Sequence, residues 1–316
     1  MPTQILDEGL QSTPGPRRIR TRTGIRVSTV VTVMNMKGGV GKTTVAMHIA
    51  GAFCRYVLGS KNARKVLVID YDPQFNLSQA FLPPKTYFSL EKARKTTLAI
   101  LLDDSTTLNP YQLQVPGNHS PPKVADVATR IYAMTNGSYL DLVPATLDLM
   151  YVALGQSSTQ LKPMEERFEK FIAECREKYD LVIVDCHPAG SIFTKTSLRN
   201  SDHVVIPVVP QRYAVRGIGL MMEFINEKRQ GVSGPAPHIL FNATSKSGAS
   251  SEETAIRGNP AFAAKCMQNT LHRFSAFSEP EAGTGFVWSS KKPYSKAARR
   301  NLLTVTQELQ VRLGVQ

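Results

Sequence analysis

What the sequence does not contain already narrows the class of protein. The chain has 316 residues, and no uninterrupted apolar run approaches the roughly 18 residues that a membrane-spanning helix needs. Its beginning, MPTQILDEGLQSTPGPRRIR, lacks the apolar stretch of a secretory signal. At 42% hydrophobic residues the chain can still bury a core. We therefore expect a soluble globular protein of the cytoplasm.

Cysteine is scarce and dispersed. The four cysteines form no C-x-x-C pair: Cys54, Cys175, Cys186 and Cys266. This spacing argues against a disulfide framework, a zinc site and an iron–sulfur site. Cys175 falls at helical spacing with the apolar residues of MEERFEKFIAECREKYD. We expect four reduced cysteines with structural roles.

Acidic residues are in the minority. Lys and Arg number 38 against 25 Asp and Glu, which gives a formal net charge of +13. The excess lies in two clusters: Arg17, Arg18, Arg20, Arg22 and Arg26, then Lys291, Lys292, Lys296, Arg299 and Arg300. A polyanionic partner, nucleic acid or an acidic membrane, would explain the excess. A solvated tail and a charged helix face are the simpler alternative.

Short β-branched runs recur between helical patterns along the chain. The runs are STVVTVMN, KVLVID, YLDLVPA, YDLVIVD, DHVVIPVV and HILFNA. Nearly continuous apolar strands that alternate with helices indicate a doubly wound, mostly parallel sheet with helices on both faces. We expect an α/β fold in one domain, residues 27–316, after a mobile basic arm, residues 1–26.

Three further segments have patterns of their own. A proline-rich stretch from about residue 82 to 138 is expected to be an irregular elaboration around a short helix in TTLAILLDD. TSKSGASSEETAIRGNP, residues 244–260, is expected to be a polar loop that leads into a late helix. An amphipathic pattern from about Ala297 to Leu313 predicts a closing helix.

The segment VVTVMNMKGGVGKTTVAMHIAGAF has the strand, glycine-rich turn and helix order of a phosphate-binding loop. The backbone amides at Gly38, Gly39 and Gly41 would wrap an anion at the helix N-terminus. Lys42 would reach the β- and γ-phosphates, and the Thr43 hydroxyl would coordinate Mg²⁺. The first glycine of the usual spacing is replaced by Met36, and a second lysine, Lys37, follows it.

The form K-G-G-x-G-K-T-T resembles the deviant Walker A motif of the ParA/MinD family of P-loop ATPases. The resemblance covers roughly residues 27–313. It implies that ATP and Mg²⁺ are the cofactors and that the loop Gly38, Gly39, Val40, Gly41, Lys42, Thr43 and Thr44 holds the nucleotide. It also implies an ATP-dependent homodimer, in which Lys37 reaches the phosphates bound by the other subunit.

Two further acidic segments agree with this resemblance. VLVIDYDPQFN is similar to the family's D-x-D-P-Q-x-N motif, which implies that Asp72 orients or activates the attacking water and that Asp70 sits near the metal. YDLVIVDCHP is similar to the Walker B segment, which implies that Asp185 holds Mg²⁺ through water. The family commonly has D-x-P-P here, so His187 departs from the pattern and is read as a space-filler or as a change in a switch loop. Cys186 is expected to be a small buried side chain.

One more site residue follows from the resemblance. LFNATSKSG places Asn242 at a strand end, where family members use an Asn to hydrogen-bond the adenine. An Asn at such a place is also a common turn former.

The resemblance implies a ParA-like partitioning ATPase of the short form, whose ATP dimer binds DNA non-specifically on the nucleoid. A ParB-like DNA-bound protein would stimulate hydrolysis. We expect Lys291, Lys292, Lys296, Arg299 and Arg300 to contact DNA phosphates, and no stable membrane association.

Three alternatives remain open. A MinD-like membrane-cycling ATPase would need an amphipathic C-terminal helix with bulky apolar residues, whereas NLLTVTQELQVRLGVQ favours a helix packed on the sheet. A relative of the nitrogenase iron protein would need cysteines spaced for a metal cluster. A purely structural interaction module would not need Lys42, Thr43, Asp72 and Asp185.

Overall fold

The computed structural model describes residues 28–56, 63–103, 108–109, 116, 120–153, 158–187, 191–227, 234–278 and 285–315. The expected basic arm, with Arg17, Arg18, Arg20, Arg22 and Arg26, lies outside the described residues. No helix among those described is long and apolar enough to cross a membrane.

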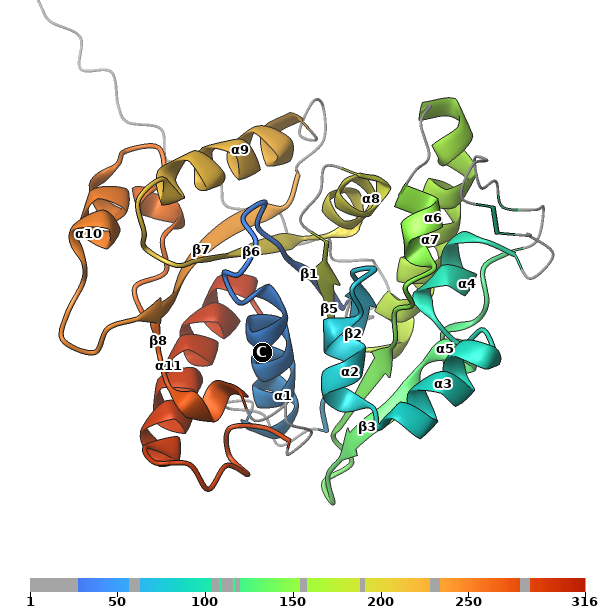
Figure 1. Cartoon of the computed structure of the whole chain (residues 1–316), viewed down its shortest axis with the longest axis horizontal. Helices are drawn as coiled ribbons and strands as arrows, with labels where there is room; N and C mark the ends of the chain where they lie inside the picture. The colour runs from blue at the N-terminus through green and yellow to red at the C-terminus, as the bar shows by residue number, and fades with distance from the viewer. Residues whose placement is uncertain are drawn as a thin grey trace, which may run out of the picture.

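An eight-stranded sheet runs through the molecule (Figure 1). Its strands are β1 (Thr29–Val33), β2 (Lys65–Tyr71), β3 (Thr129–Ala133), β4 (Tyr139–Val143), β5 (Leu181–Cys186), β6 (His203–Val208), β7 (Ala236–Thr244) and β8 (Leu271–His272). Their order is β3-β4-β2-β5-β1-β6-β7-β8, and only β3 runs antiparallel to its neighbour. β1 lies between β5 and β6, so the chain reverses its winding there. In such sheets ligands bind beyond the carboxyl ends of the strands at this reversal.

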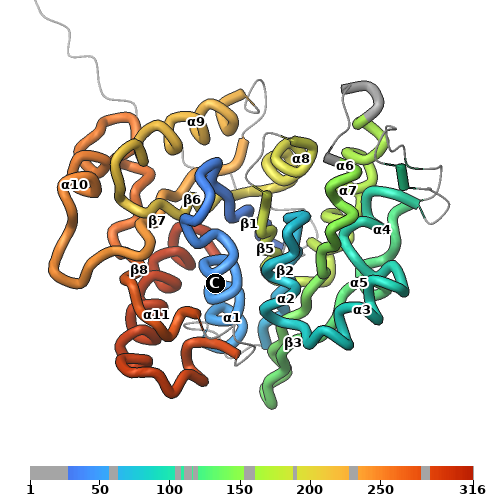
Figure 2. Tube along the Cα trace, viewed as in Figure 1, coloured from blue at the N-terminus to red at the C-terminus, as the bar shows by residue number. Residues whose placement is uncertain are grey.

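Helices cover both faces of the sheet. They are α1 (Lys42–Tyr56), α2 (Asn76–Phe81), α3 (Pro84–Lys92), α4 (Thr97–Leu101), α5 (Val124–Val127), α6 (Leu149–Ala153), α7 (Ser158–Lys178), α8 (Ile192–Asn200), α9 (Ala214–Glu227), α10 (Ser251–Gly258) and α11 (Ser295–Leu313), with the 3-10 turns η1 (Ala263–Lys265) and η2 (Ser275–Ser278). The trace in Figure 2 shows α11 beside α1, although they are at opposite ends of the chain. α7, α8 and α9 contribute to the other face.

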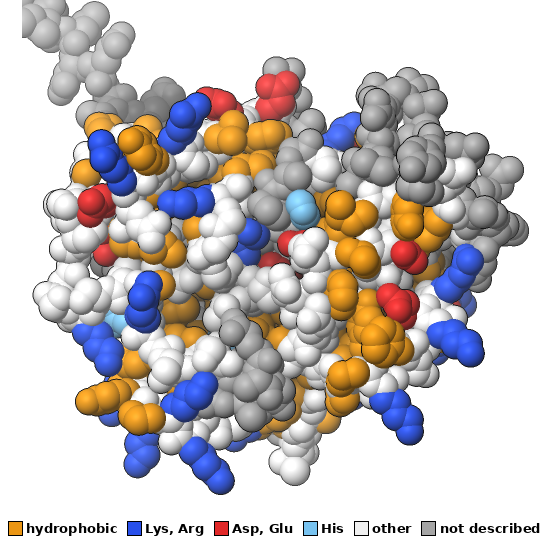
Figure 3. All heavy atoms as spheres, in the orientation of Figure 1, with side chains coloured by type: hydrophobic (Ala, Val, Ile, Leu, Met, Phe, Trp, Pro, Cys, Tyr) orange, Lys and Arg blue, Asp and Glu red, His pale blue; other side chains and the backbone are white. Residues whose placement is uncertain are grey.

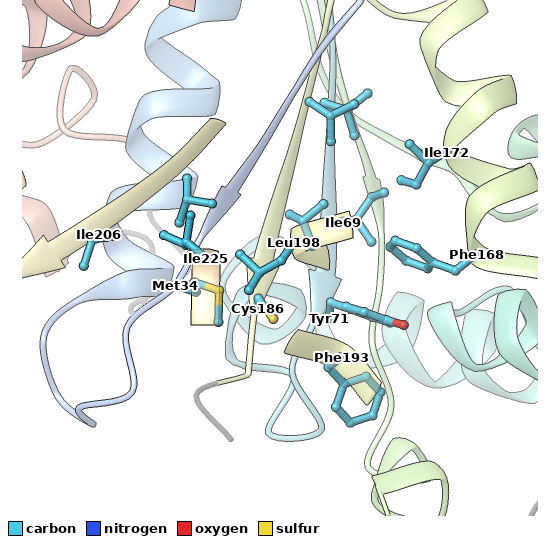
Figure 4. Close-up of a cluster of buried hydrophobic side chains, with 14 of the residues drawn as sticks. Met34, Ile69, Tyr71, Phe168, Ile172, Cys186, Phe193, Leu198, Ile206 and Ile225 are labelled. Carbon is cyan, nitrogen blue, oxygen red and sulfur yellow. The ribbon is translucent and has the colours of Figure 1, made fainter. Parts of the chain in front are cut away.

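Side chains alternate between these two faces along each strand, which divides the apolar interior into two cores. In β1, Val31 and Val33 join the core under α1 and α11, whereas Val30 joins the core under α7, α8 and α9. Figure 4 shows part of the second core, where Tyr71 at the end of β2 lies near Phe168 and Phe193. These nearly continuous buried strands are what a sheet covered on both faces requires.

The structure confirms the doubly wound fold, and each of the six predicted apolar runs contains a strand. The prediction of a loop throughout residues 244–260 is wrong, because α10 occupies Ser251–Gly258. The Ser250 side chain caps this helix by accepting a hydrogen bond from the Glu253 amide at 3.2 Å. Residues 82–138 contain α3, α4, α5 and β3 in their described part.

The closing helix is confirmed as a helix packed on the sheet. Leu302, Val305 and Leu309 of α11 are fully buried in the core that also contains α1. A helix that lies on a membrane needs its apolar face free for lipid. The apolar face of α11 is therefore part of the protein core.

Candidate nucleotide site

The phosphate-binding loop connects β1 to α1 at the carboxyl edge of the sheet. Gly39 and Gly41 have φ angles of 71° and 81°, a region that favours glycine. A Cβ atom at Gly41 would also lie 2.4 Å from Asn242 Nδ2. Gly38 and Gly39 are exposed, whereas Val40 is buried and anchors the loop. Lys42 is the first residue of α1, so the loop and the helix N-terminus face the same place.

Lys37 is held by contacts on both its backbone and its side chain. Its amide donates to Asn35 Oδ1 at 3.0 Å, and its Nζ donates to Gln211 Oε1 at 3.1 Å. Asn35 is buried and also donates to the Pro207 carbonyl at 2.8 Å. Asn35 and Gln211 were not predicted as site residues; their signal in the sequence is a polar residue shortly after each of two neighbouring strands. Lys37 is thus tied to the segment after β6.

Asp185 ends the apolar run of β5 and faces the loop. It is buried, and its Oδ2 has no hydrogen-bond partner among the described residues. Burial raises the pKa of Asp185 to about 7, opposed by a hydrogen bond from the Thr43 side chain. The nearby charge of Asp72 raises this pKa further, and that of Lys42 lowers it. A buried carboxylate with a free oxygen beside a threonine hydroxyl is a suitable pair for Mg²⁺.

Asp70 and Asp72 end β2 next to Asp185 but differ in environment. Asp70 is fully buried, and its Oδ2 accepts from the Ser78 amide at 2.8 Å and from the Ser78 hydroxyl at 2.6 Å. Its Oδ1 accepts from the Asp72 amide at 3.3 Å. Burial and the charge of Asp185 raise the pKa of Asp70 well above its ordinary value. Asp72 is only partly buried, so its carboxylate can meet a ligand.

His187 and Cys186 follow Asp185. His187 is partly buried, and its amide donates to the Tyr71 carbonyl at 3.3 Å. Burial lowers the pKa of His187 and so favours the neutral ring, whereas the negative charge of Asp72 raises this pKa. Cys186 is fully buried, as predicted, and burial raises the pKa of its thiol to about 12. All four cysteines are free and buried.

Asn242 lies on β7 against the loop, as the sequence placed it at a strand end. Its Nδ2 donates to the Val40 carbonyl at 2.8 Å, and the residue is 9% exposed. The Asn242 side chain therefore packs against the phosphate-binding loop. Figure 3 shows basic, acidic and histidine side chains close together near the middle of this face, over the ends of the central strands.

Among the described residues no group of three or more His, Cys, Asp and Glu side chains is placed to hold a metal ion without other ligands. Magnesium in phosphate sites takes only one or two protein carboxylates, with water and phosphate oxygens completing its shell. The residues present thus suit a metal that arrives with a phosphate group.

The second cationic cluster lies away from the loop, at the start of α11. Lys291, Lys296, Arg299 and Arg300 are exposed. Lys292 differs, because its Nζ donates to Ser278 Oγ at 3.0 Å and to the Ser275 carbonyl at 3.3 Å. Lys246 was not predicted as a member of this cluster; its Nζ lies 4.7 Å from the ring centre of Tyr294 and 4.0 Å from that of Phe274. We call Lys246, Lys291, Lys296, Arg299 and Arg300 the basic patch; Figure 3 shows basic side chains at the lower left of the molecule, where α11 and β8 lie.

A family model described as an AAA domain matches residues 28–233, more than half of the chain. The chain belongs to this family. It is 30% identical over 198 residues to the sporulation initiation inhibitor protein Soj of Bacillus subtilis, covering 62% of this chain and 64% of Soj. It is 26% identical over 287 residues to a ParA family protein of Chlamydia trachomatis, covering 88% and 96% of the two chains. These relatives confirm the resemblance to ParA-type ATPases.

The fold also agrees with that of a solved structure. A plasmid partition protein from Borrelia burgdorferi B31, in a crystal structure bound to AMPPNP, superposes with a TM-score of 0.63. Its sequence identity is 19%, over 89% of this chain and 99% of that chain. The likeness extends beyond residues 28–233 and therefore includes part of the segment that contains β7, β8 and α11.

Proposed function

We propose that the protein is an ATPase of the ParA type that binds ATP with Mg²⁺, forms a dimer on ATP and binds DNA non-specifically. Hydrolysis, stimulated by a DNA-bound partner of the ParB kind, would then drive the segregation or positioning of a plasmid or chromosome in the cytoplasm. The observation that carries this proposal is the presence of Lys37 at the phosphate-binding loop in addition to Lys42. The expected site residues surround that loop, on the ends of β1, β2, β5 and β7.

The residues around Asp185 support a nucleotide with a divalent metal. The loop amides from Gly38 to Thr44 and the N-terminus of α1 would hold the phosphates, and Lys42 would neutralise their charge. Thr43 and Asp185 would hold Mg²⁺, which when bound would offset the negative charge of the β- and γ-phosphates. The buried Oδ2 of Asp185, which lacks a hydrogen-bond partner among the described residues, fits this role. Asn242 would contact the adenine.

Asp72 is the residue that we assign to the attacking water. Both its backbone and its side chain are held, because its amide donates to Asp70 Oδ1 at 3.3 Å and its own Oδ1 accepts from the Gln74 amide at 2.9 Å. Phosphoryl transfer needs mainly such positioning. Asp70 would lie near the metal as expected, but its oxygens already accept hydrogen bonds from Ser78 and Asp72. We therefore assign Asp70 a positioning role.

Lys37 supports an ATP-timed dimer. Its side chain points to Gln211, on the segment after β6, and is partly exposed. A lysine at this place can leave Gln211 at little cost, since an exposed hydrogen bond contributes only about 1 kcal/mol. In the dimer it would meet the phosphates of the other subunit. Dimerisation would then depend on the nucleotide, as a switch requires.

The basic patch supports contact with DNA phosphates. Its members are lysines and arginines from two separate segments, and such contacts are sequence-independent and salt-sensitive. Lys292 is a weaker candidate than expected, because its amine is engaged by Ser275 and Ser278. Binding along a nucleoid would follow from this type of contact.

A titration of fluorescent duplex DNA with ATP, with ADP and without nucleotide tests the proposal. Binding should be tightest with ATP, equal for unrelated sequences, and should weaken as salt rises. A variant with Lys291, Lys296, Arg299 and Arg300 changed to Ala should bind less tightly and with a shallower salt dependence. In the matched control, four exposed basic residues on and just after α3 are changed to Ala: Lys85, Lys92, Arg94 and Lys95. Equal binding in all three nucleotide conditions would contradict the proposal.

A further inference from the structure

β7 connects the nucleotide site to the neighbourhood of the basic patch. At one point on this strand Asn242 contacts the Val40 carbonyl of the phosphate-binding loop. Four residues later, Lys246 lies against the rings of Phe274 and Tyr294. Tyr294 directly precedes α11, which carries Lys296, Arg299 and Arg300. The two sites are therefore joined by a few residues of one chain segment.

The backbone between Asn242 and Lys246 has an unusual conformation. Ala243 has a φ angle of 53°, a left-handed conformation that a non-glycine residue rarely adopts. The pairing of β7 with β8 shifts register at this position. Strain of this kind persists only where the surroundings hold it. The hydrogen bond from Asn242 to Val40 fixes the backbone before Ala243, and the hydrogen bonds of Thr244 fix the backbone after it.

Thr244 joins β7 to β8 through its side chain. It is 5% exposed, and its Oγ1 lies 2.9 Å from His272 Nδ1 and donates to Thr270 Oγ1 at 3.2 Å. The Thr244 carbonyl also accepts from the Arg273 amide at 3.0 Å. A change in the backbone at Ala243 would therefore reach β8 directly.

Asn301 joins β8 to α11. Its Oδ1 accepts from the His272 amide at 2.9 Å, and its Nδ2 donates to the Thr270 carbonyl at 2.8 Å. The side chain thus makes two hydrogen bonds to the same two residues that Thr244 contacts. Asn301 directly follows Arg300 on α11, so it fixes the part of the helix that carries the patch.

We propose that this route, from Asn242 through Thr244 and β8 to Asn301, couples the nucleotide site to DNA binding at the basic patch. It rests on the proposed function. A side-chain amide has two N–H donors and one carbonyl acceptor, so the bond to Val40 leaves groups of Asn242 with which to meet the adenine. Nucleotide binding at Asn242 then shifts the β7 backbone beside Ala243. The hydrogen bonds of Thr244 to β8 and of Asn301 to β8 transmit this shift to α11.

The test compares DNA affinity with AMPPNP and with ADP in full-length variants. Asn301→Ala and Thr244→Val remove contacts of the route without touching either site. The ratio of the two DNA affinities should fall by at least about fivefold in each variant, while AMPPNP affinity without DNA stays unchanged. By linkage, the increase in AMPPNP affinity caused by DNA should fall by the same factor. Thr304→Val, which alters an exposed hydroxyl of α11, is the control and should keep the full ratio.

Asn301→Asp is a second variant that keeps the acceptor for the His272 amide, replaces the donor to Thr270 by a carboxylate oxygen and adds one negative charge. It should lose part of the ratio and retain the cooperative unfolding of the wild type. Full retention of the ratio in Asn301→Ala and Thr244→Val would overturn the coupling.

Hydrogen exchange separates this proposal from the proposed function. If wild-type DNA binding ignores the nucleotide, the proposed function fails and exchange then tests the route by itself. AMPPNP should slow exchange in the peptide that contains residues 270–273, and Asn301→Ala should abolish this effect. Equal exchange with and without AMPPNP in the wild type would refute the route.

Discussion

Replacing Asp185 by Asn should stabilise the protein while removing its metal site. Asp185 is buried at the end of β5, and burial raises its pKa from the ordinary value of 3.8 to about 7. The folded protein therefore holds a proton on Asp185 in a pH range where the unfolded chain has released it. The neutral amide of Asn has nearly the same shape and carries no charge to bury.

The size of the effect depends on pH, and its sign follows from the protons bound. Because Asp185 holds more protons in the folded state than in the unfolded state between pH 3.8 and about 7, its contribution to wild-type stability falls as pH rises through this window. The cost is about 2 kcal/mol at pH 5 and about 4 kcal/mol at pH 8, at 1.36 kcal/mol for each unit of pKa. The stability advantage of Asp185→Asn over the wild type should therefore grow by about 3 kcal/mol between pH 5 and pH 8.

Urea unfolding followed by circular dichroism at pH 5 and pH 8 measures this gain. Asp126→Asn, at an exposed position, is the control and should show no such pH-dependent gain. Mg²⁺ with ATP at 100 times its dissociation constant should stabilise the wild type by about 2.7 kcal/mol, and Asp185→Asn by much less. An Asn variant that is less stable than the wild type at pH 8 would refute the argument that burial dominates at Asp185.

Three further predictions concern the nucleotide site. Lys37→Ala should retain ATP binding, measured by calorimetry, but lose ATP-dependent dimers in analytical ultracentrifugation; dimers of normal affinity would show that Lys37 acts within its own subunit. Asp72→Ala should stop phosphate release and keep ATP-dependent dimers, whereas hydrolysis at the normal rate would exclude Asp72 as the group that handles water. Gly41→Ala should weaken ATP binding at least about tenfold, because left-handed backbone costs a side chain 1–2 kcal/mol and the new Cβ would displace Asn242. Gly219→Ala, whose Cβ would meet nothing within 4 Å, is the control for Gly41→Ala and should bind ATP normally.

Local patterns were sufficient for most of the sheet and for the phosphate-binding loop. Each of the six buried runs is long, β-branched and bounded by turn residues, so its conformation is set by its own residues. β8 is only two residues long and β3 is partly exposed, and neither carries such a pattern. α10 was missed although Ser250 and Glu253 form a recognisable helix cap.

The residue pattern alone therefore specifies a phosphate-binding loop at the end of a parallel sheet, because glycine spacing, strand and helix act over a few residues. It does not specify the neighbours of that loop. Asn242 contacts Val40 across 202 residues, and Lys37 meets Gln211 across 174. Two contacts of the basic patch also join separate segments: Lys246 lies against Tyr294, and the Lys292 amine donates to Ser278. Such contacts depend on which strand ends meet at one edge of the sheet, and strand order becomes defined only when the whole chain packs.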